Sequence, residues 1–164
     1  MRVGLPVALV LGLASSVLSA NDYEALFGAM KKAWPQVGTV AVVCDSAGSK
    51  AALGNLTGAA GGYKVMVVDV KGPADMGKAI GTLSGRRPDA VVLLAGDHVA
   101  GDGSSAATFL IQRMAAIKVP TAASTEAGVK QGAALGIGAG GKLLANAKVA
   151  AVAGVAVPAG ATPL

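Results

Sequence analysis

The chain has 164 residues, of which 53% are apolar and 14% charged, a balance that excludes a disordered protein and allows one domain with a real core. One Trp, two Tyr and two Phe are too few for the stacking surfaces that bind single-stranded nucleic acid. The net charge of +5 is scattered, and the adjacent basic pairs, Lys31-Lys32 and Arg86-Arg87, lie at predicted helix ends. Solvated helix ends explain these pairs better than a nucleic-acid patch does.

The residue types of segment 1–20 follow one another in the order found in secretory signal peptides. Arg2 gives a positive start, Val3–Leu13 is an apolar run, and small residues complete the segment. The run is shorter than the about 20 residues that span a bilayer, and the next residue is Asn21 rather than the Cys of a lipid anchor. A buried N-terminal helix is the alternative interpretation. We expect a periplasmic or secreted protein with a single α/β domain at 21–164 and no stable membrane anchor.

Helical and strand patterns alternate along the first half of this domain. Asn21 and Glu24 have capping-box spacing at the start of a helix that Pro35 stops. Thr39–Asp45 is a continuous apolar run of the kind found in buried strands. A weak, Gly-interrupted helix and a second strand follow, at Ser46–Gly62 and Tyr63–Val70.

The alternation continues in the second half. A helix with its apolar face from Met76 to Leu83 precedes a third strand at Ala90–Ala95, and Ser104 or Ser105 caps the next helix. The remaining predicted elements are a short fourth strand, a fifth strand and a last helix, at Val119–Ala123, Ala133–Gly138 and Lys142–Ala153. The tail, Val155–Leu164, lies either as an edge strand or over the surface.

Continuous apolar strands that alternate with helices predict a mostly parallel sheet with both faces covered. With right-handed crossovers this pattern gives a three-layer α/β/α sandwich, here with five strands. In such sheets ligands bind at the carboxyl ends of the strands, beside the point where the strand order reverses. We expect three loops of this chain to meet there.

These three loops carry the candidate ligand-binding residues. The first, Asp45–Ser49, leads into a helix N-terminus whose N–H groups and hydroxyls could hold a carboxylate or phosphate, although plain helix capping explains it equally well. The second, Gly96–Ser104, is long for such a connection and holds two acids and the single His. The third follows the fourth strand. The candidates are Asp45, Ser46, Ser49, Asp97, His98, Ser124, Thr125 and Glu126.

The residue patterns favour binding over catalysis. Cys44 is the single cysteine, and we interpret it as a buried thiol rather than a reactive or intermolecular one. Asp97, His98 and Asp102 permit a metal site, but their spacing matches no known set of ligands. Gly136–Lys142 resembles a phosphate loop but lacks the spacing of a P-loop. We therefore expect no metal, no cofactor and no catalytic residue.

Several segments resemble one lobe of the ABC-transporter substrate-binding proteins with the type I periplasmic binding fold, especially the branch linked to aromatic amino-acid uptake. Ala33–Asp45 is similar to the segment that opens the lobe, and Pro88–His98 is similar to that branch's D-A-I-Y-V-P-x-D segment. Val119-Pro120 looks like its I-P-V strand. Gly132–Gly138 and Gly154–Pro158 look like its closing segment.

The resemblance implies a flavodoxin-like lobe with strand order 2-1-3-4-5 and with Asp97 as a loop acid near the ligand. The chain departs from the family at Cys44 and Ala95, where the family has Tyr and Pro. Family members close two lobes around a ligand, whereas this chain has room for one. A second copy of the chain or a membrane transporter component is therefore the expected partner.

Three classes of function stay open at this point. The resemblance implies an exported module that binds a small molecule, amino-acid-like or a carboxylate, and does not bind nucleic acid. The alternative is a non-catalytic structural or regulatory interaction domain that kept the lobe fold without ligand binding. An enzyme is the third class, and no acid–base constellation supports it. Since Asp97 belongs to a loop, its replacement by Ala is expected to weaken binding and to leave folding intact.

Overall fold

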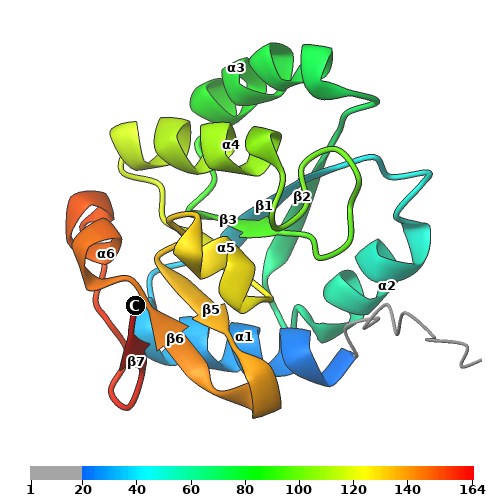
Figure 1. Cartoon of the computed structure of the whole chain (residues 1–164). Helices are drawn as coiled ribbons and strands as arrows, with labels where there is room; N and C mark the ends of the chain where they lie inside the picture. Colours follow the sequence, from blue (N-terminus) through cyan, green and yellow to red (C-terminus); the bar gives the residue numbers. More distant parts are fainter. Residues whose placement is uncertain (1–19) are drawn as a thin grey trace, which may run out of the picture.

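A single sheet of seven strands forms the centre of the computed structural model, which describes residues 20–164 (Figure 1). The predicted signal peptide, apart from Ala20, lies outside the described residues. The strands are β1 Thr39–Cys44, β2 Lys64–Asp69, β3 Ala90–Leu93, β4 Thr121–Ala123, β5 Leu135–Ile137, β6 Leu143–Ala145 and β7 Thr162–Pro163. Their order is β2-β1-β3-β4-β5-β6-β7. The first five strands are parallel to one another, β6 is antiparallel to β5, and β7 is parallel to β6.

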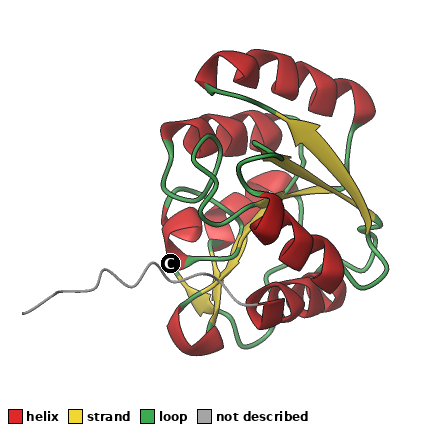
Figure 2. Cartoon of the chain, turned by 90° about the vertical axis from the view of Figure 1, so that its right-hand side faces the viewer, coloured by secondary structure: helices red, strands yellow, loops and turns green. Residues whose placement is uncertain are grey.

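Helices cover both faces of the sheet, which confirms the three-layer α/β/α class (Figure 2). Successive side chains of β1 point to opposite faces, so Val40 and Val42 pack with α1 and α2, whereas Ala41 and Val43 pack with α3 and α4. The helices are α1 Ala20–Ala33, α2 Lys50–Ala59, α3 Met76–Arg86, α4 Ser105–Ala116, α5 Glu126–Lys130 and α6 Ala147–Ala153.

The sheet has two more strands than the five predicted, so its order extends beyond β5. Residues 143–145, expected within the last helix, pair antiparallel with β5 as strand β6. The reason is a turn at Gly140 and Gly141, whose φ angles of 70° and 76° suit glycine and reverse the chain. The last helix starts only after Asn146, whose Oδ1 accepts a hydrogen bond from the Val149 N–H at 3.1 Å. In the tail, Thr162–Pro163 adopts the edge-strand alternative.

Helix boundaries also differ from the predicted ones. α1 begins at Ala20, so Asn21 lies inside the helix rather than at its cap. The helix predicted from residue 46 to 62 is shortened to α2. Ser104 caps α4 by accepting a hydrogen bond from the Ala107 N–H at 3.0 Å, which confirms one of the two predicted caps. The short helix α5 is absent from the prediction, and it packs beside β4 and β5.

Small side chains and a few aromatic ones build the core. Tyr23 and Trp34 of the α1 region are each about 1% exposed and are the largest fully buried side chains. The Trp34 indole N–H donates a hydrogen bond to the Ala156 carbonyl at 2.9 Å, which ties the tail to the end of α1. Among residues 20–164, no helix is long and apolar enough to cross a bilayer.

Cys44 is buried at the end of β1, and burial raises the pKa of its thiol to about 12. Because the thiolate is the reactive form, the native protein should not react with a thiol reagent near pH 8. We expect one equivalent to react only after unfolding in urea. Stoichiometric labelling of the native protein on the timescale of minutes would contradict this placement of Cys44.

Candidate functional site

Polar side chains gather where the three strands β1, β2 and β3 end. Asp45 follows β1, Asp69 ends β2 and Lys71 comes shortly after it, and Asp97 and His98 lie in the loop after β3. Parallel neighbours end at the same edge of a sheet, so the loops after β1 and β3 lie together, as expected from the sequence.

Asp97 joins these two loops through its carboxylate. One oxygen accepts hydrogen bonds from the Asp45 N–H at 2.9 Å and the Ser49 hydroxyl at 2.6 Å. The other accepts from the Val99 and Ala100 N–H groups at 3.0 and 2.7 Å. Asp97 is 5% exposed, so the premise of an exposed loop acid, on which the expected intact folding of Asp97→Ala rests, is wrong. A buried carboxylate with four protein donors holds the loops in place.

A charged cluster, which we define as Asp45, Asp69, Lys71 and His98, lies at the surface of the same edge. The Lys71 ammonium lies between the two carboxylates, 2.8 Å from Asp45 and 3.1 Å from Asp69. The His98 imidazole lies 3.6 Å from Asp45, a contact that becomes an ion pair when the ring is protonated. The Lys71 and His98 side chains are 59% and 62% exposed, so both can reach a ligand from solvent.

Mutual contacts stabilise the charged forms in this cluster. Hydrogen bonds from Ser46 and then Lys71 lower the pKa of Asp69 to about 2. The hydrogen bond from Lys71 also lowers the pKa of Asp45, and the two carboxylates raise the pKa of Lys71. Asp45, Asp69 and Lys71 therefore stay charged across the physiological pH range, and this edge presents both signs of charge to solvent.

Most polar groups of the first predicted loop, Asp45–Ser49, form hydrogen bonds within the protein. Ser46 donates its N–H and its hydroxyl to Asp69 at 2.9 and 2.6 Å, and Ala47 donates its N–H to Asp45 at 3.3 Å. Ser49 is buried and donates to Asp97. The Ser46 and Ala47 N–H groups of this loop, considered from the sequence as part of a carboxylate or phosphate site, are thus occupied by the chain's own acids.

Sequence reasoning missed Asp69 and Lys71. The predicted strand order could have indicated both residues, because an order of 2-1-3 places the end of β2 beside the end of β1. A hollow of about 390 Å³ adjoins Asp69 between β2 and α3 and is lined by side chains of both charges. Its charged lining residues are Asp69, Asp75, Lys78 and Arg86.

The third predicted loop lies next to the second, and within the described residues it forms no hydrogen bond or ion pair with the charged cluster. Ser124 is buried beside Tyr23, whose hydroxyl accepts a hydrogen bond from the Ala95 N–H at 3.1 Å. Thr125 donates to Asp102 at 2.6 Å and caps α5. Glu126 forms an exposed pair with Lys130 one helical turn away. Of these three candidates, none reaches Asp45 or His98 in the described structure.

Asp102 belongs to the second loop and is half-buried, and within the described residues its buried Oδ1 oxygen has no hydrogen-bond partner. Desolvation raises its pKa to about 6, outweighing the hydrogen bond from Thr125. The three residues considered from the sequence as possible metal ligands therefore differ in their surroundings: Asp97 is enclosed by donors, His98 is exposed, and Asp102 is half-buried with one buried carboxyl oxygen. Residues 20–164 contain no group of three acids, His or Cys placed to hold a metal ion.

A pH dependence of stability follows from Asp102. Its folded-state pKa of about 6 lies above the ordinary value of 3.8, so the folded chain holds this proton more tightly than the unfolded chain. The free energy of unfolding should therefore lose about 2–3 kcal/mol from this group as pH rises from 4 to 7. Asp102→Asn should remove that loss, measured as the difference between variant and parent in urea unfolding at pH 4, 5, 6 and 7. A constant difference at all four values would show that Asp102 ionises normally.

No protein-family model matches the sequence, and no curated protein is similar enough to be matched. Among solved structures, a conserved domain protein from Vibrio cholerae O1 biovar eltor strain N16961 is 20% identical, with a TM-score of 0.72. That match covers 86% of this chain and 59% of the other.

Two further solved structures are binding proteins. An ABC domain from Streptococcus pneumonia in complex with L-Trp is 17% identical, with a TM-score of 0.71 over 87% of this chain and 60% of the other. A ligand-free, open substrate-binding protein with adhesive properties from Clostridium difficile is 16% identical, with a TM-score of 0.73 over 90% and 60%. This likeness establishes a shared fold. The chain spans about 60% of the length of these structures, consistent with a single lobe.

Proposed function

We propose that this protein is an exported small-molecule-binding lobe and that its ligand is amino-acid-like. The observation that carries the proposal is the charged cluster, with exposed Lys71 and His98 beside two acids at the carboxyl ends of β1 to β3. This edge is where sheets of this order bind ligands. Support also comes from the shared fold, because a solved structure with that fold holds L-Trp.

The chemistry of the cluster fits a zwitterion better than a simple anion. Asp45 and Asp69 offer carboxylate oxygens to an ammonium group, Lys71 offers a cation to a carboxylate, and the His98 ring offers an N–H donor. The Ser46 and Ala47 N–H groups are already used by these acids, so a ligand carboxylate would meet the Lys71 ammonium instead. Lys71 is already paired with Asp45 and Asp69, so a ligand would displace part of this pairing rather than bind to an unpaired charge.

A lone lobe offers a shelf, whereas small-ligand sites bury most of the ligand in a cleft. The chain spans about 60% of the solved binding proteins, so a second surface is needed to close the site. A second copy of the chain or a transporter component would supply it, and a twofold dimer is the commonest arrangement. Binding rather than catalysis is the proposed role.

The test is a thermal-shift screen of the full chain against the common amino acids and small carboxylates, followed by calorimetric titration of any hit. A ligand at 100 times its dissociation constant adds about 2.7 kcal/mol to the free energy of unfolding, which a melting curve resolves easily. Lys71→Gln and Asp69→Asn should each weaken binding of that ligand about tenfold. Lys148→Gln, an exposed lysine on α6, is the matched control and should bind like the parent.

The second candidate function is a non-catalytic interaction domain that kept the lobe fold. The observation in its favour is that the charged groups of the cluster already pair with one another, so the edge is electrostatically satisfied without a ligand. If no amino acid or carboxylate shifts the melting temperature, this candidate replaces the first.

Export is part of the proposal and has its own test. The charge, apolar run and small residues of 1–20 support cleavage before Asn21. Mass spectrometry of the protein isolated from its native compartment should give a mature chain that starts near Asn21. An intact Met1 in a cytoplasmic fraction would contradict export, with no bearing on whether the lobe binds a ligand.

A further inference from the structure

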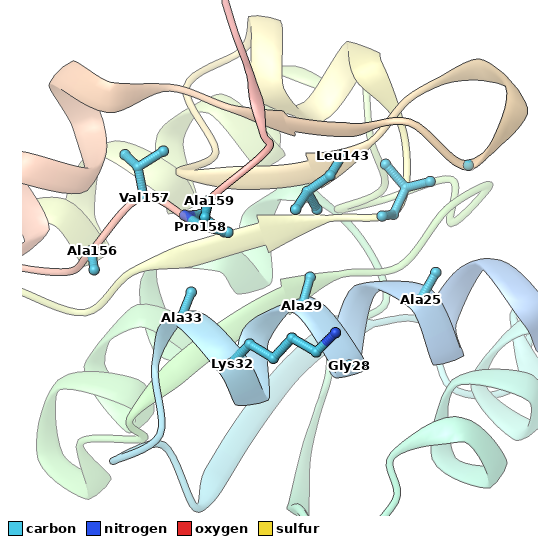
Figure 3. Close-up of a pocket in the computed structure, with 12 residues that line it drawn as sticks. Ala25, Gly28, Ala29, Lys32, Ala33, Leu143, Ala156, Val157, Pro158 and Ala159 are labelled. Atoms are coloured by element: carbon cyan, nitrogen blue, oxygen red, sulfur yellow. The ribbon is translucent and has the colours of Figure 1, made fainter.

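A second hollow in the described structure, a groove of about 570 Å³, has no lining residue in the charged cluster (Figure 3). One wall is α1, the second is the β5–β6 hairpin, and the third is the tail that follows α6. Figure 3 shows the side chains of Ala25, Ala29 and Ala33 directed from α1 toward the strands, with Leu143 above them. The proposed function makes no use of this groove.

Specific hydrogen bonds hold the tail wall in place. The Trp34 indole N–H donates to the Ala156 carbonyl at 2.9 Å, at the end where the tail meets α1. The Val155 N–H donates to the Ala150 carbonyl at 3.0 Å, and the Leu164 N–H donates to the Ala145 carbonyl at 3.0 Å. The tail is therefore fixed on both sides of the segment 156–159 that lines the groove.

The groove is open because, apart from Lys32, the α1 residues that line it are small. A Cβ placed on Gly28 would meet no atom within 4 Å, so the space beside the helix is open. The other walls are apolar, formed by Ile137, Leu143 and the tail residues Val157 and Pro158.

Lys32 is the one charged residue among those that line the groove. It has no ion-pair or hydrogen-bond partner in the described part of the chain. No acid lines the groove to repel an anion. An apolar trough with a single unpaired cation is complementary to a molecule that has an apolar chain and one negative end.

We propose that this groove binds an amphipathic carboxylate, with the apolar chain along α1 and the carboxylate at Lys32. The stretch of α1 from Ala25 to Ala33 is about 12 Å long, the reach of an extended chain of about ten carbons. The carboxylate pairs with the Lys32 ammonium at the rim, where it keeps contact with water. This site is independent of the amino-acid-like ligand proposed for the charged cluster.

The test uses the full chain and decanoate as the probe, below its micellar concentration. Trp34 is the single tryptophan and is bonded to Ala156 in the groove wall, so its fluorescence should report occupancy. We expect saturable binding of decanoate and weaker binding of decyltrimethylammonium, which has the same chain and the opposite charge. Lys32→Gln should weaken decanoate binding about three- to fivefold, as expected for an exposed ion pair.

Gly28→Leu is the decisive variant, because its side chain would fill the groove while the backbone position accepts a Cβ. We expect it to abolish decanoate binding and to keep the parent's melting temperature or raise it. Gly54→Leu, at an equally open position on α2, and Lys31→Gln, the neighbouring lysine, are the matched controls and should bind like the parent.

Three results would overturn the proposal. One is the absence of saturable decanoate binding to the full chain. Another is unchanged decanoate affinity in Gly28→Leu. The third is a dimer in the parent that Gly28→Leu converts to a monomer, since the groove would then be an interface between copies of the chain.

Discussion

Asp97→Ala is expected to destabilise the protein by about 3–5 kcal/mol, whether or not a ligand is present. The variant leaves the Asp45, Val99 and Ala100 N–H groups and the Ser49 hydroxyl without their acceptor. These donors lie in a region where Asp97 is 5% exposed, so water cannot replace the carboxylate without opening the loops. Urea unfolding followed by circular dichroism measures the loss directly.

The control for this variant is Glu126→Ala, which removes an acid of the third loop. Glu126 is half exposed and pairs only with Lys130 at the surface, so its loss should change stability by about 0.5 kcal/mol or less. Asp97→Asn should fall between the two, because the amide keeps one acceptor oxygen and turns the other into a donor. An Asp97→Ala protein as stable as the parent would mean that the loops are held by other contacts.

The outcome also separates two roles for Asp97. The family resemblance implies a loop acid near the ligand, and a ligand contact predicts lost affinity in a normally folded protein. The structure instead shows both carboxylate oxygens occupied by donors from the protein. Asp97 is thus best described as a residue that positions Asp45 and His98, which reach solvent where Asp97 does not.

The central part of the fold follows from the sequence because its signals are local. Thr39–Cys44 and Ala90–Leu93 are short, continuous, Val-rich apolar runs, a composition typical of strands buried on both faces. The hairpin at β5 and β6 could not be predicted in the same way. Its Ala- and Leu-containing strand is compatible with a helix, and two glycines with positive φ decide the outcome.

The site is harder to predict than the fold, because the role of each polar residue depends on how deeply its side chain is buried, which the sequence does not reveal. Asp97 and Asp69 are both acids at strand ends, yet Asp97 is enclosed and Asp69 faces solvent beside Lys71. The difference arises because β3 lies inside the sheet and β2 is its edge. Ser124 is a second example. A polar serine at a strand end is expected to be exposed, yet this one is fully buried.

Gly101→Ala should produce the second large loss of stability, about 2–3 kcal/mol. A Cβ at this position would overlap the Asp97 carbonyl oxygen and lie 2.8 Å from the Asp97 nitrogen. Both are backbone atoms, so no side-chain rotation relieves the contact. The loop must open, and the hydrogen bond from the Gly101 N–H to the Asp97 carbonyl, 3.1 Å long, would be lost with it.

Gly81→Ala is the matched control, because a Cβ there meets nothing within 4 Å in the middle of α3. Helix propensity predicts that this variant gains about 0.5–1 kcal/mol, so the same chemical change has opposite signs at the two positions. Parallel urea unfolding of both variants makes the comparison. Equal stability of the two would mean that the 97–101 turn relaxes freely. In that case the strand-end loops would be too pliable to hold the charged cluster in one geometry.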